Sequence, residues 1–374
     1  MILNRAIKMR IYPNDEQRHK IDATLGHCRY IYNKMLERNT VIYKRRKEHL
    51  NYYAMQNLLP EMKEYLPWLK EADSQALKYT CRQLNVAFDR FFKKLGAYPK
   101  FHTKHGKQSY TTTNTKVICV ESHNVKLPCL GWIRTSETRI PDGKLCYATV
   151  SREADNRYYV SITYKAEASD IMPVTPNPEK TIGLDYKSDG LYMDSNGHTE
   201  DIPHFYREAK RKRTKLQRRL SKKQGSRKGE RKSMNFMKRL RKVNRQSTHI
   251  ANQRKDYLHK LSTEIANRCD AICVEDLDMK AMSNKGFGNG KATMDNGYGM
   301  FQNMLSYKLK ERGRYLVVVD KWYPSSQLCH CCGHRQKMPL KIRVYQCPEC
   351  GMVCDRDWNA AINIKMEGLR FLSA

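Results

Sequence analysis

Two Cys-x-x-Cys pairs near the end of the chain constrain its fold more tightly than any other feature. Cys329 and Cys332 form the first pair, and Cys347 and Cys350 form the second after an interval of fourteen residues. Two such pairs can direct four thiolates at one tetrahedral Zn²⁺ ion. Because four thiolates leave no ligand position open for water, we expect a structural zinc ribbon over residues 329–354.

The cysteine content as a whole favours a reducing compartment. The chain has 13 cysteines, an odd number, and five of them lie between Cys329 and Cys350. This crowding suits metal thiolates better than a disulfide framework. The sequence also contains no secretory signal pattern and no apolar run long enough to span a membrane. We therefore expect a soluble intracellular protein without a membrane partner.

Positive charge is concentrated in one long segment. The chain carries 70 Lys and Arg against 38 Asp and Glu, and residues 207–260 alone hold 22 basic and 3 acidic residues. Like charges at this density repel unless phosphates neutralise them, although a solvated helix face is the alternative. We predict a basic helical arm that contacts nucleic acid. Its candidate contact residues are Lys210, Arg211, Arg218, Arg219, Lys222, Lys223 and Arg254.

Hydrophobic periodicity divides the chain into regions of different secondary structure. Residues 2–11 alternate as a strand, helical spacing follows Pro13 and continues to residue 94, and short β-type runs occupy residues 105–166. These runs fit a small β-barrel that pairs with the first strand. From Thr181 onward, strands and helices alternate, which is typical of an α/β domain. The predicted fold class is a multidomain α+β protein.

Three acidic residues lie at the ends of three different predicted elements. Asp185 ends one apolar strand, Glu275 ends another, and Asp357 stands where an alanine-rich helix begins. Hydrolysis of a phosphodiester by two Mg²⁺ ions requires acidic ligands that converge from different elements. Each acid alone also has a plain structural role, such as ending a strand or capping a helix. Together with the positive charge, they make a nuclease the favoured hypothesis.

Several motifs occur in a characteristic order. They are YPNDEQ, YPKFHTK, GLDYKSDG, NQRKDYLHKLS, VEDLDMKAMS, GMFQNMLSYKLKERG, WYPSSQLCHCCG and DRDWNAAINI. This order resembles TnpB, a family of transposon-associated RNA-guided nucleases related to type V CRISPR effectors. The resemblance implies a wedge β-barrel (1–11 and 105–178) interrupted by a helical recognition segment (12–104). It also implies an RNase H-like RuvC domain (179–328 and 355–374) with the zinc ribbon inserted.

The resemblance also implies roles for residues and partners. Asp185, Glu275 and Asp357 match the RuvC triad that binds two catalytic Mg²⁺ ions. This leaves Asp355 either as a helix cap or as a group just outside the metal ligands. Trp358 is expected to pack near the site. The implied partners are a transposon-derived guide RNA and a double-stranded DNA target recognised beside a short motif. The protein is expected to act as a monomer on one RNA in the cytoplasm of a prokaryote.

The helical segment and the chain after it contain further candidates. Gln75, Lys78 and Arg82 recur at helical spacing, Tyr52 lies upstream of them, and Lys100 and Phe101 combine a cation with a ring. These side chains could contact bases or the backbone, and the same pattern also fits ordinary helix surface and core. Glycine and asparagine recur over residues 284–299, so we expect a mobile loop there, which acts either as a lid or only as a disordered connection.

Four other functions are compatible with part of the pattern. A compact type V CRISPR effector shares the chemistry and differs in the source of its guide. A nuclease-silent RNA-guided regulator would lack the carboxylates that this chain retains. A structural RNA-binding protein would share the charge and the ribbon but would give the three acids no role. A transposase that acts directly on DNA ends would need a catalytic pattern that the sequence does not show.

Overall fold

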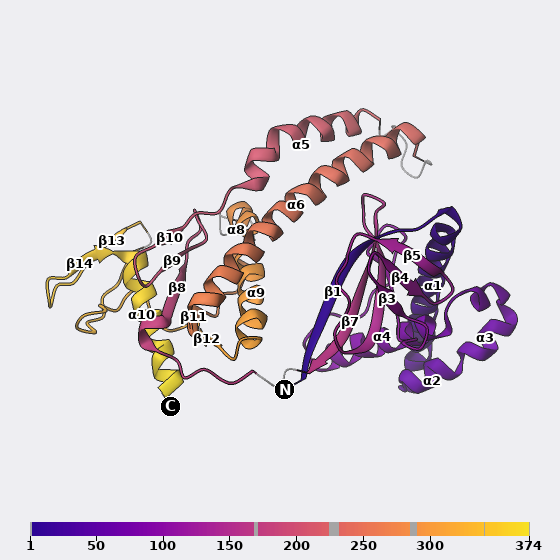
Figure 1. Cartoon of the computed structure of the whole chain (residues 1–374), viewed down its shortest axis with the longest axis horizontal. Coiled ribbons are helices and arrows are strands. Elements are labelled where there is room, and N and C mark those ends of the chain that lie inside the picture. The colour runs from indigo at the N-terminus through magenta and orange to yellow at the C-terminus, as the bar shows by residue number, and fades with distance from the viewer. Residues whose placement is uncertain (1, 168–170, 224–231, 285–289, 340, 374) are drawn as a thin grey trace. The chain divides into compact units, whose positions relative to one another are not determined.

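The computed structural model describes residues 2–167, 171–223, 232–284, 290–339 and 341–373. The chain divides into two compact units, Met1–Ser169 and Asp170–Ala374, and each is considered by itself (Figure 1). In the part of the chain that the structure describes, no helix is both long enough and apolar enough to cross a bilayer.

The first unit is built on a seven-stranded antiparallel sheet. The strand order is β2-β6-β7-β1-β5-β4-β3. The bounds are β1 Ile2–Tyr12, β2 Gln108–Thr112, β3 Cys119–Glu121, β4 Asn124–Leu127, β5 Gly131–Thr135, β6 Lys144–Arg152 and β7 Tyr158–Glu167. Within the described ranges no ladder joins the edge strands β2 and β3, so the predicted small β-barrel is not found as a closed barrel. The sheet stays open because helices, rather than its own far edge, cover its apolar face.

Five helical elements lie between β1 and β2. They are α1 Asp15–Arg46, α2 Tyr52–Asn57, α3 Leu59–Tyr65, the 3₁₀ turn η1 Pro67–Glu71 and α4 Ser74–Phe92. The side chain of Asn14 accepts the N–H of Gln17 and the side chain of Gln17 accepts the N–H of Asn14, which fixes the start of α1 as a capping box. Ile31 of α1, Leu77 of α4 and Val150 of β6 belong to one hydrophobic cluster. Helices and sheet therefore share a single core.

The second unit contains a mixed five-stranded sheet between two layers of helices. The order is β10-β9-β8-β11-β12, in which β8, β11 and β12 run parallel. The bounds are β8 Thr181–Tyr186, β9 Tyr192–Asp194, β10 Thr199–Glu200, β11 Ala271–Glu275 and β12 Tyr315–Val319. Helices α6 (Met234–Arg268) and α9 (Tyr298–Lys310) share one cluster with Leu184 and Val274, while α10 (Arg356–Ser373) packs on the opposite face (Figure 1). This is the α/β arrangement that the sequence predicted.

The remaining elements extend this framework. The 3₁₀ turn η2 (Pro178–Lys180) precedes β8, α5 (Phe205–Ser221) packs along α6, and β13 (Val344–Gln346) pairs with β14 (Val353–Asp355). The basic arm is therefore a pair of helices, and its residues 224–231 lie outside the described residues. Tyr257 donates to the carboxylate of Glu200, which ties the C-terminal half of α6 to the sheet.

The predicted lid over residues 284–299 is only partly described. Residues 285–289 lie outside the described residues, but residues 290–296 form helix α8 (Gly290–Asn296), which follows the short α7 (Met279–Met282). Asp295 of α8 is buried, accepts the backbone N–H groups of Tyr206 and Arg207, and pairs with Arg254 at 2.7 Å. These tertiary contacts override the low helix propensity of glycine and asparagine, so the expectation of a loop is wrong for residues 290–296.

Two glycines allow α10 to approach the sheet closely. A methyl group on Gly183 of β8 would overlap the backbone carbonyl of Ala361, and one on Gly368 would overlap the sulfur of Cys273. The helix therefore sits directly on β8 and β11 at a distance that only glycine permits.

We expect Gly183→Ala to destabilise the second unit by about 1–3 kcal/mol, because the clash involves backbone that cannot rotate away. Urea unfolding followed by circular dichroism measures this change. Gly26→Ala in α1 is a matched control with the opposite expected sign. Its new methyl group would meet only the guanidinium of Arg29 at 3.8 Å, and alanine favours the helix. Equal stability of Gly183→Ala and the unmodified protein would contradict the close approach of α10 to β8.

Candidate functional site

Strand register brings Asp185 and Glu275 to neighbouring positions. Leu184 pairs with Val274 in parallel strands, so Asp185 and Glu275 follow side by side at the carboxyl ends of β8 and β11. Side chains alternate along a strand, and Gly183 and Cys273, two residues earlier, face α10. The two carboxylates therefore project from the face of the sheet that α10 covers.

Helix α10 presents Asp357 on the same face. The carboxylate of Asp355 accepts the N–H groups of Asp357 at 2.8 Å and Trp358 at 3.0 Å, and so acts as the helix cap that the sequence analysis expected. Asp357 is only 7% exposed. The indole N–H of Trp358 donates to the carbonyl of Ser195 at 3.1 Å, which fixes the first turn of α10 against the hairpin that follows β8.

The electrostatics of the three acids indicate a concentration of negative charge. Burial raises the pKa of Asp185 well above its usual value, and the charges of Glu275 and Asp357 raise it further. Burial also raises the pKa of Glu275, against a hydrogen bond from Ser325 that lowers it. Groups arranged in this way favour the binding of a cation, because a cation relieves the repulsion between them.

Two arginines partly neutralise Asp357. The guanidinium of Arg356 donates to one carboxylate oxygen at 2.9 Å, and Arg343 lies 3.5 Å from the other. Among the described residues, only the four ribbon cysteines have ligand atoms that all lie within 4.8 Å of one another. The three carboxylates are thus more widely spaced than the ligands of a single ion. Carboxylate oxygens are the ligands that hard cations such as Mg²⁺ prefer, so the chemistry of this donor set fits such an ion.

The structure adds supporting residues that the sequence analysis missed. Ser325 is buried and donates its hydroxyl to Glu275, which orients that carboxylate. Asn359 and Asn363 of α10 donate to the carbonyl of Leu328 at 2.7 and 2.8 Å and so anchor the start of the ribbon. Two asparagines four residues apart on an alanine-rich helix were the available sequence signal for this anchor.

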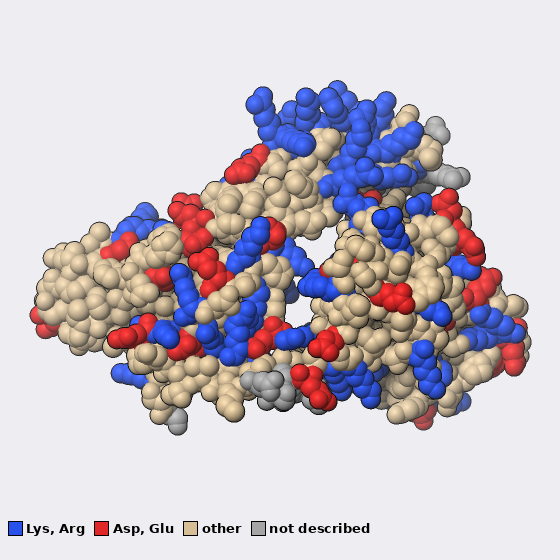
Figure 2. Space-filling view, in the orientation of Figure 1, with Lys and Arg blue, Asp and Glu red and all other residues tan. Residues whose placement is uncertain are grey.

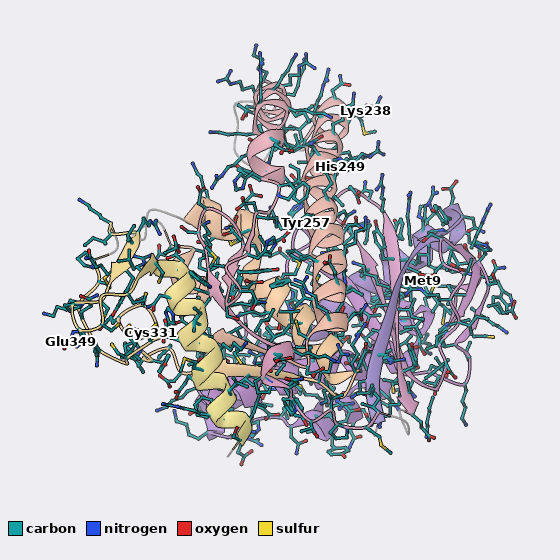
Figure 3. All side chains as sticks on the ribbon, turned by 60° about the vertical axis from the view of Figure 1, so that its left-hand side comes forward. Met9, Lys238, His249, Tyr257, Cys331 and Glu349 are labelled. Carbon is teal, nitrogen blue, oxygen red and sulfur yellow. The ribbon has the colours of Figure 1, made fainter. Side chains whose placement is uncertain are left out.

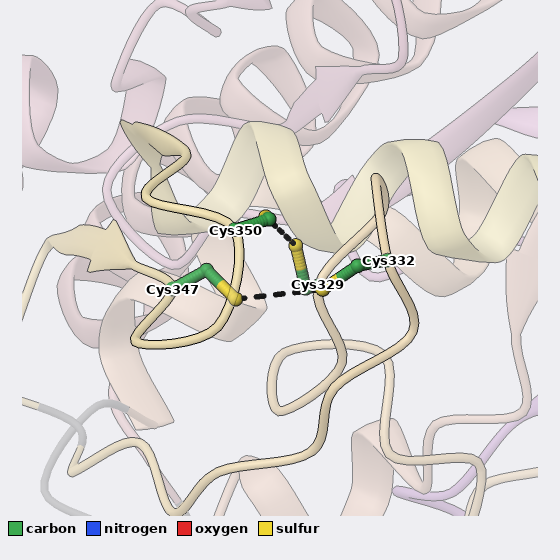
Figure 4. Close-up of side chains that lie close together, drawn as sticks. All are labelled: Cys329, Cys332, Cys347 and Cys350. Carbon is green, nitrogen blue, oxygen red and sulfur yellow. Dashed lines mark hydrogen bonds between the residues drawn. The ribbon is translucent and has the colours of Figure 1, made fainter.

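The four cysteines of the ribbon converge as predicted (Figure 4). The sulfur atoms of Cys329 and Cys350 lie 3.6 Å apart, and those of Cys332 and Cys347 lie 3.5 Å apart. Zn–S bonds of about 2.3 Å in a tetrahedron require sulfur atoms about 3.8 Å apart, so the donor set fits zinc. A glycine with positive φ follows each pair, Gly333 at 76° and Gly351 at 72°, and its N–H donates to the first cysteine's carbonyl. This backbone turn brings both thiolates of a pair to one side.

Basic side chains gather over the helix pair α5–α6 (Figure 2). Among the described residues, Lys210, Arg211, Arg218, Arg219, Lys222 and Lys223 have no acidic partner. No side chain of α5 is buried. Figure 3 shows Lys238 and His249 along α6 beyond Tyr257, while Cys331 and Glu349 lie in the ribbon. The arm therefore offers cationic groups that are available to phosphates. Arg254 differs, because Asp295 already occupies its guanidinium.

The first unit contains a cavity of about 1060 Å³ between α1, α4 and the sheet. Two of the predicted contact residues, Arg82 and Phe101, line it. Gln75 accepts a hydrogen bond from Thr113 near its wall, whereas Tyr52 packs against the hydrophobic core. Lys78 is half-buried and Lys100 is exposed outside the cavity lining. The structure thus brings together only part of the predicted set.

Three family models match successive parts of the chain. Residues 1–48 match a model described as "Helix-turn-helix domain", residues 160–285 one described as "Probable transposase", and residues 298–364 one described as "Cas12f1-like, TNB domain". In this structure, the described part of residues 1–48 forms strand β1 and the single long helix α1. The third match covers α9, β12, the ribbon and the first turns of α10.

Two curated relatives match almost the whole chain. A "Putative RNA-guided DNA endonuclease" of Streptomyces pristinaespiralis is 33% identical over 98% of this chain and 90% of its own length. The "Putative RNA-guided DNA endonuclease InsQ" of Escherichia coli K12 is 29% identical over 97% of this chain and 92% of its own. A solved Cas12f1–sgRNA–target DNA complex shares the fold, with a TM-score of 0.61 at 13% identity over 97% of this chain and 99% of that one.

Proposed function

This chain belongs to the TnpB-like family of RNA-guided DNA endonucleases, and from that membership we propose that it cleaves DNA selected by a bound guide RNA. Two relatives that carry this description match 97–98% of the chain, a span that includes the ribbon and the segments with the three carboxylates. Sequence recognition is assigned to base pairing with the guide, because the arm contributes phosphate contacts, which carry no sequence information.

The cleavage site that we propose is the cluster of Asp185, Glu275 and Asp357. The observation that carries this assignment is the burial of Asp185 near two further carboxylates. Burial and the neighbouring charges raise the pKa of Asp185 and favour the binding of cations at this position. These three residues would hold two Mg²⁺ ions, which when bound activate water and stabilise the leaving oxygen. Ser325 holds Glu275 in position, and the Asp355 cap holds the first turn of α10 that carries Asp357.

Further assignments follow from the same proposal. One zinc ion is structural and lies among the four ribbon cysteines. The guide is derived from a transposon end, the target is double-stranded DNA beside a short motif, and one protein acts on one RNA in a prokaryotic cytoplasm. Arg82 and Phe101, which share the cavity of the first unit, remain candidate nucleic-acid contacts.

The test is to purify the protein from its native locus, sequence the RNA that accompanies it, and add Mg²⁺ with a plasmid library that matches this RNA. Guide-dependent cleavage beside a common motif is the expected result. A guide transcribed from a CRISPR array would indicate the effector alternative. Binding of the matched plasmid without cleavage would indicate the nuclease-silent regulator, and the absence of an RNA-dependent interaction with DNA would contradict the proposal.

The arm makes a quantitative prediction about salt. Replacing Arg218, Arg219, Lys222 and Lys223 together by glutamine should reduce the slope of log affinity for RNA against log salt by about 0.7–0.9 for each lost phosphate contact, or about 3 in total. Filter binding between 50 and 300 mM NaCl, roughly the range in which counterion release is measured, gives both slopes. The matched control replaces Lys44, Arg45, Arg46 and Lys47 at the exposed end of α1. Equal slope changes in the two variants would show that the phosphate contacts are not made by the arm in particular.

A further inference from the structure

Trp322 is unusually exposed for a large hydrophobic residue. Its side chain is 80% exposed, more than that of any other large hydrophobic residue except Met172 in the part of the chain that the structure describes. Burial of an indole is strongly favourable, so an exposed one that is held in place is typical of a binding surface. The proposed cleavage chemistry assigns Trp322 no role.

The loop that carries Trp322 is attached to Glu275 at both ends. On one side, Val319 of β12 pairs with Glu275, and its carbonyl accepts the N–H of Asp276 at 3.0 Å. On the other side, Ser325 donates its hydroxyl to the Glu275 carboxylate. Residues 320–324 therefore leave the neighbourhood of Glu275 and return to it, with Trp322 at the centre.

Hydrogen bonds within the loop fix its shape. The carboxylate of Asp320 accepts the N–H of Trp322 at 2.7 Å, and the carbonyl of Asp320 accepts the N–H of Tyr323 at 3.0 Å. Tyr323 is attached to α10 through a hydrogen bond from its hydroxyl to the carbonyl of Asn363. The backbone of the loop is thus held by β11 and α10, the elements that carry Glu275 and Asp357.

The loop combines the two groups that bind a single nucleic-acid strand. The ammonium of Lys321 lies 5.0 Å from the centroid of the Trp322 ring, so a cation accompanies the exposed aromatic face. Proteins that hold unpaired strands use aromatic rings for the bases and cations for the backbone. Only three residue steps separate Trp322 from Ser325, and such a segment spans at most about 10 Å, so the indole lies close to the residue that orients Glu275.

We propose that Trp322 stacks on an unpaired base of the DNA strand about to be cut, close to the scissile phosphate. Lys321 contacts a neighbouring phosphate. The pair then holds the strand over Asp185, Glu275 and Asp357. This inference rests on the proposed nuclease function and extends it by assigning a residue that positions the substrate.

The test uses the protein with its co-purified RNA and target DNA that carries 2-aminopurine at successive positions around the cut. In the Asp185→Asn background, which is expected to bind without cutting, stacking on Trp322 should quench 2-aminopurine at one or two positions. Trp322→Ala should lose this quenching and, in the active protein, slow cleavage by about 5- to 100-fold, the range for loss of one stacked base. Trp322→Phe should retain most of both signals, and guide-dependent DNA affinity should stay within about twofold, because other contacts dominate it.

Phe371→Ala, which removes an exposed ring from the far end of α10, is the control and should change neither signal. Unchanged cleavage and quenching in Trp322→Ala would overturn the inference. Quenching that depends on Trp322 in a protein that does not cleave would instead remove the nuclease proposal and leave the stacking role standing. If the protein binds no DNA, both proposals fail.

Discussion

Asp185→Asn should reduce guided DNA cleavage by at least about 10³-fold, because the cations that Asp185 would hold stabilise the transition state by several kcal/mol. Guide-dependent DNA binding should remain nearly unchanged, since the carboxylate contacts neither phosphates nor bases in this proposal. Single-turnover cleavage and gel-shift affinity, measured on the same preparation, separate the two effects. Glu275→Gln and Asp357→Asn are expected to behave in the same way.

Asp355→Asn is the matched control for this prediction. It removes a neighbouring carboxylate, but asparagine also caps helices well, so the first turn of α10 should persist. We expect its cleavage rate to fall by less than about tenfold, the effect of a change outside the metal ligands. Cleavage by Asp185→Asn at the rate of the unmodified protein would exclude the assigned site.

The raised pKa of Asp185 gives a second readout that does not depend on cleavage. A carboxyl group whose pKa is higher in the folded protein stabilises the fold at low pH, and this contribution is lost as the pH rises through the folded pKa. Without divalent metal at neutral pH, the crowded carboxylates therefore destabilise the second unit. Asp185→Asn should melt at a higher temperature than the unmodified protein in EDTA. Mg²⁺ should raise the melting temperature of the unmodified protein more than that of the variant.

Cys347→Ser should lower the zinc content from about one ion to near zero per chain, because three thiolates and a hydroxyl bind zinc far more weakly than four thiolates. Structural zinc contributes about 10–16 kcal/mol in small zinc peptides, so the ribbon should unfold without it. Its hydrogen bonds with α10 would then be lost near Ser325 and Asp357, and cleavage should fall with them. Elemental analysis and a cleavage assay measure both effects.

Cys331→Ser is the control for the zinc prediction. Cys331 lies between the first two ligands in sequence, but it is exposed and does not belong to the converging set of four. We expect this variant to keep its zinc and its activity. A Cys347→Ser protein that retains one zinc ion per chain would show that the ligand set is wrong.

Several features of the fold could be predicted because they depend on local spacing. The apolar strands that end at Asp185 and Glu275, the capping role of Asp355 and the Cys-x-x-Cys turns each involve residues only a few positions apart. The open sheet of the first unit could not be predicted in this way. Whether β2 meets β3 depends on how α1 and α4 cover the sheet, and no sequence period encodes that packing.

The partners of individual side chains were also decided by long-range contacts. In the sequence, Arg254 does not differ from the other cations of the arm. Its ion pair with Asp295 forms only because α8 folds next to α6. Ser325 and Glu275 are fifty positions apart, so their contact has no sequence signature.

The sequence by itself determined the ligand types, the charge of the arm and the ends of the strands that carry acids, because covalent spacing and side-chain chemistry do not depend on tertiary structure. Only the tertiary structure decided that Gly183 and Gly368 let α10 rest on the sheet, and that both ends of the loop with Trp322 contact Glu275. Those arrangements follow from close packing between distant segments, in which the volume of each side chain limits the approach of its neighbours.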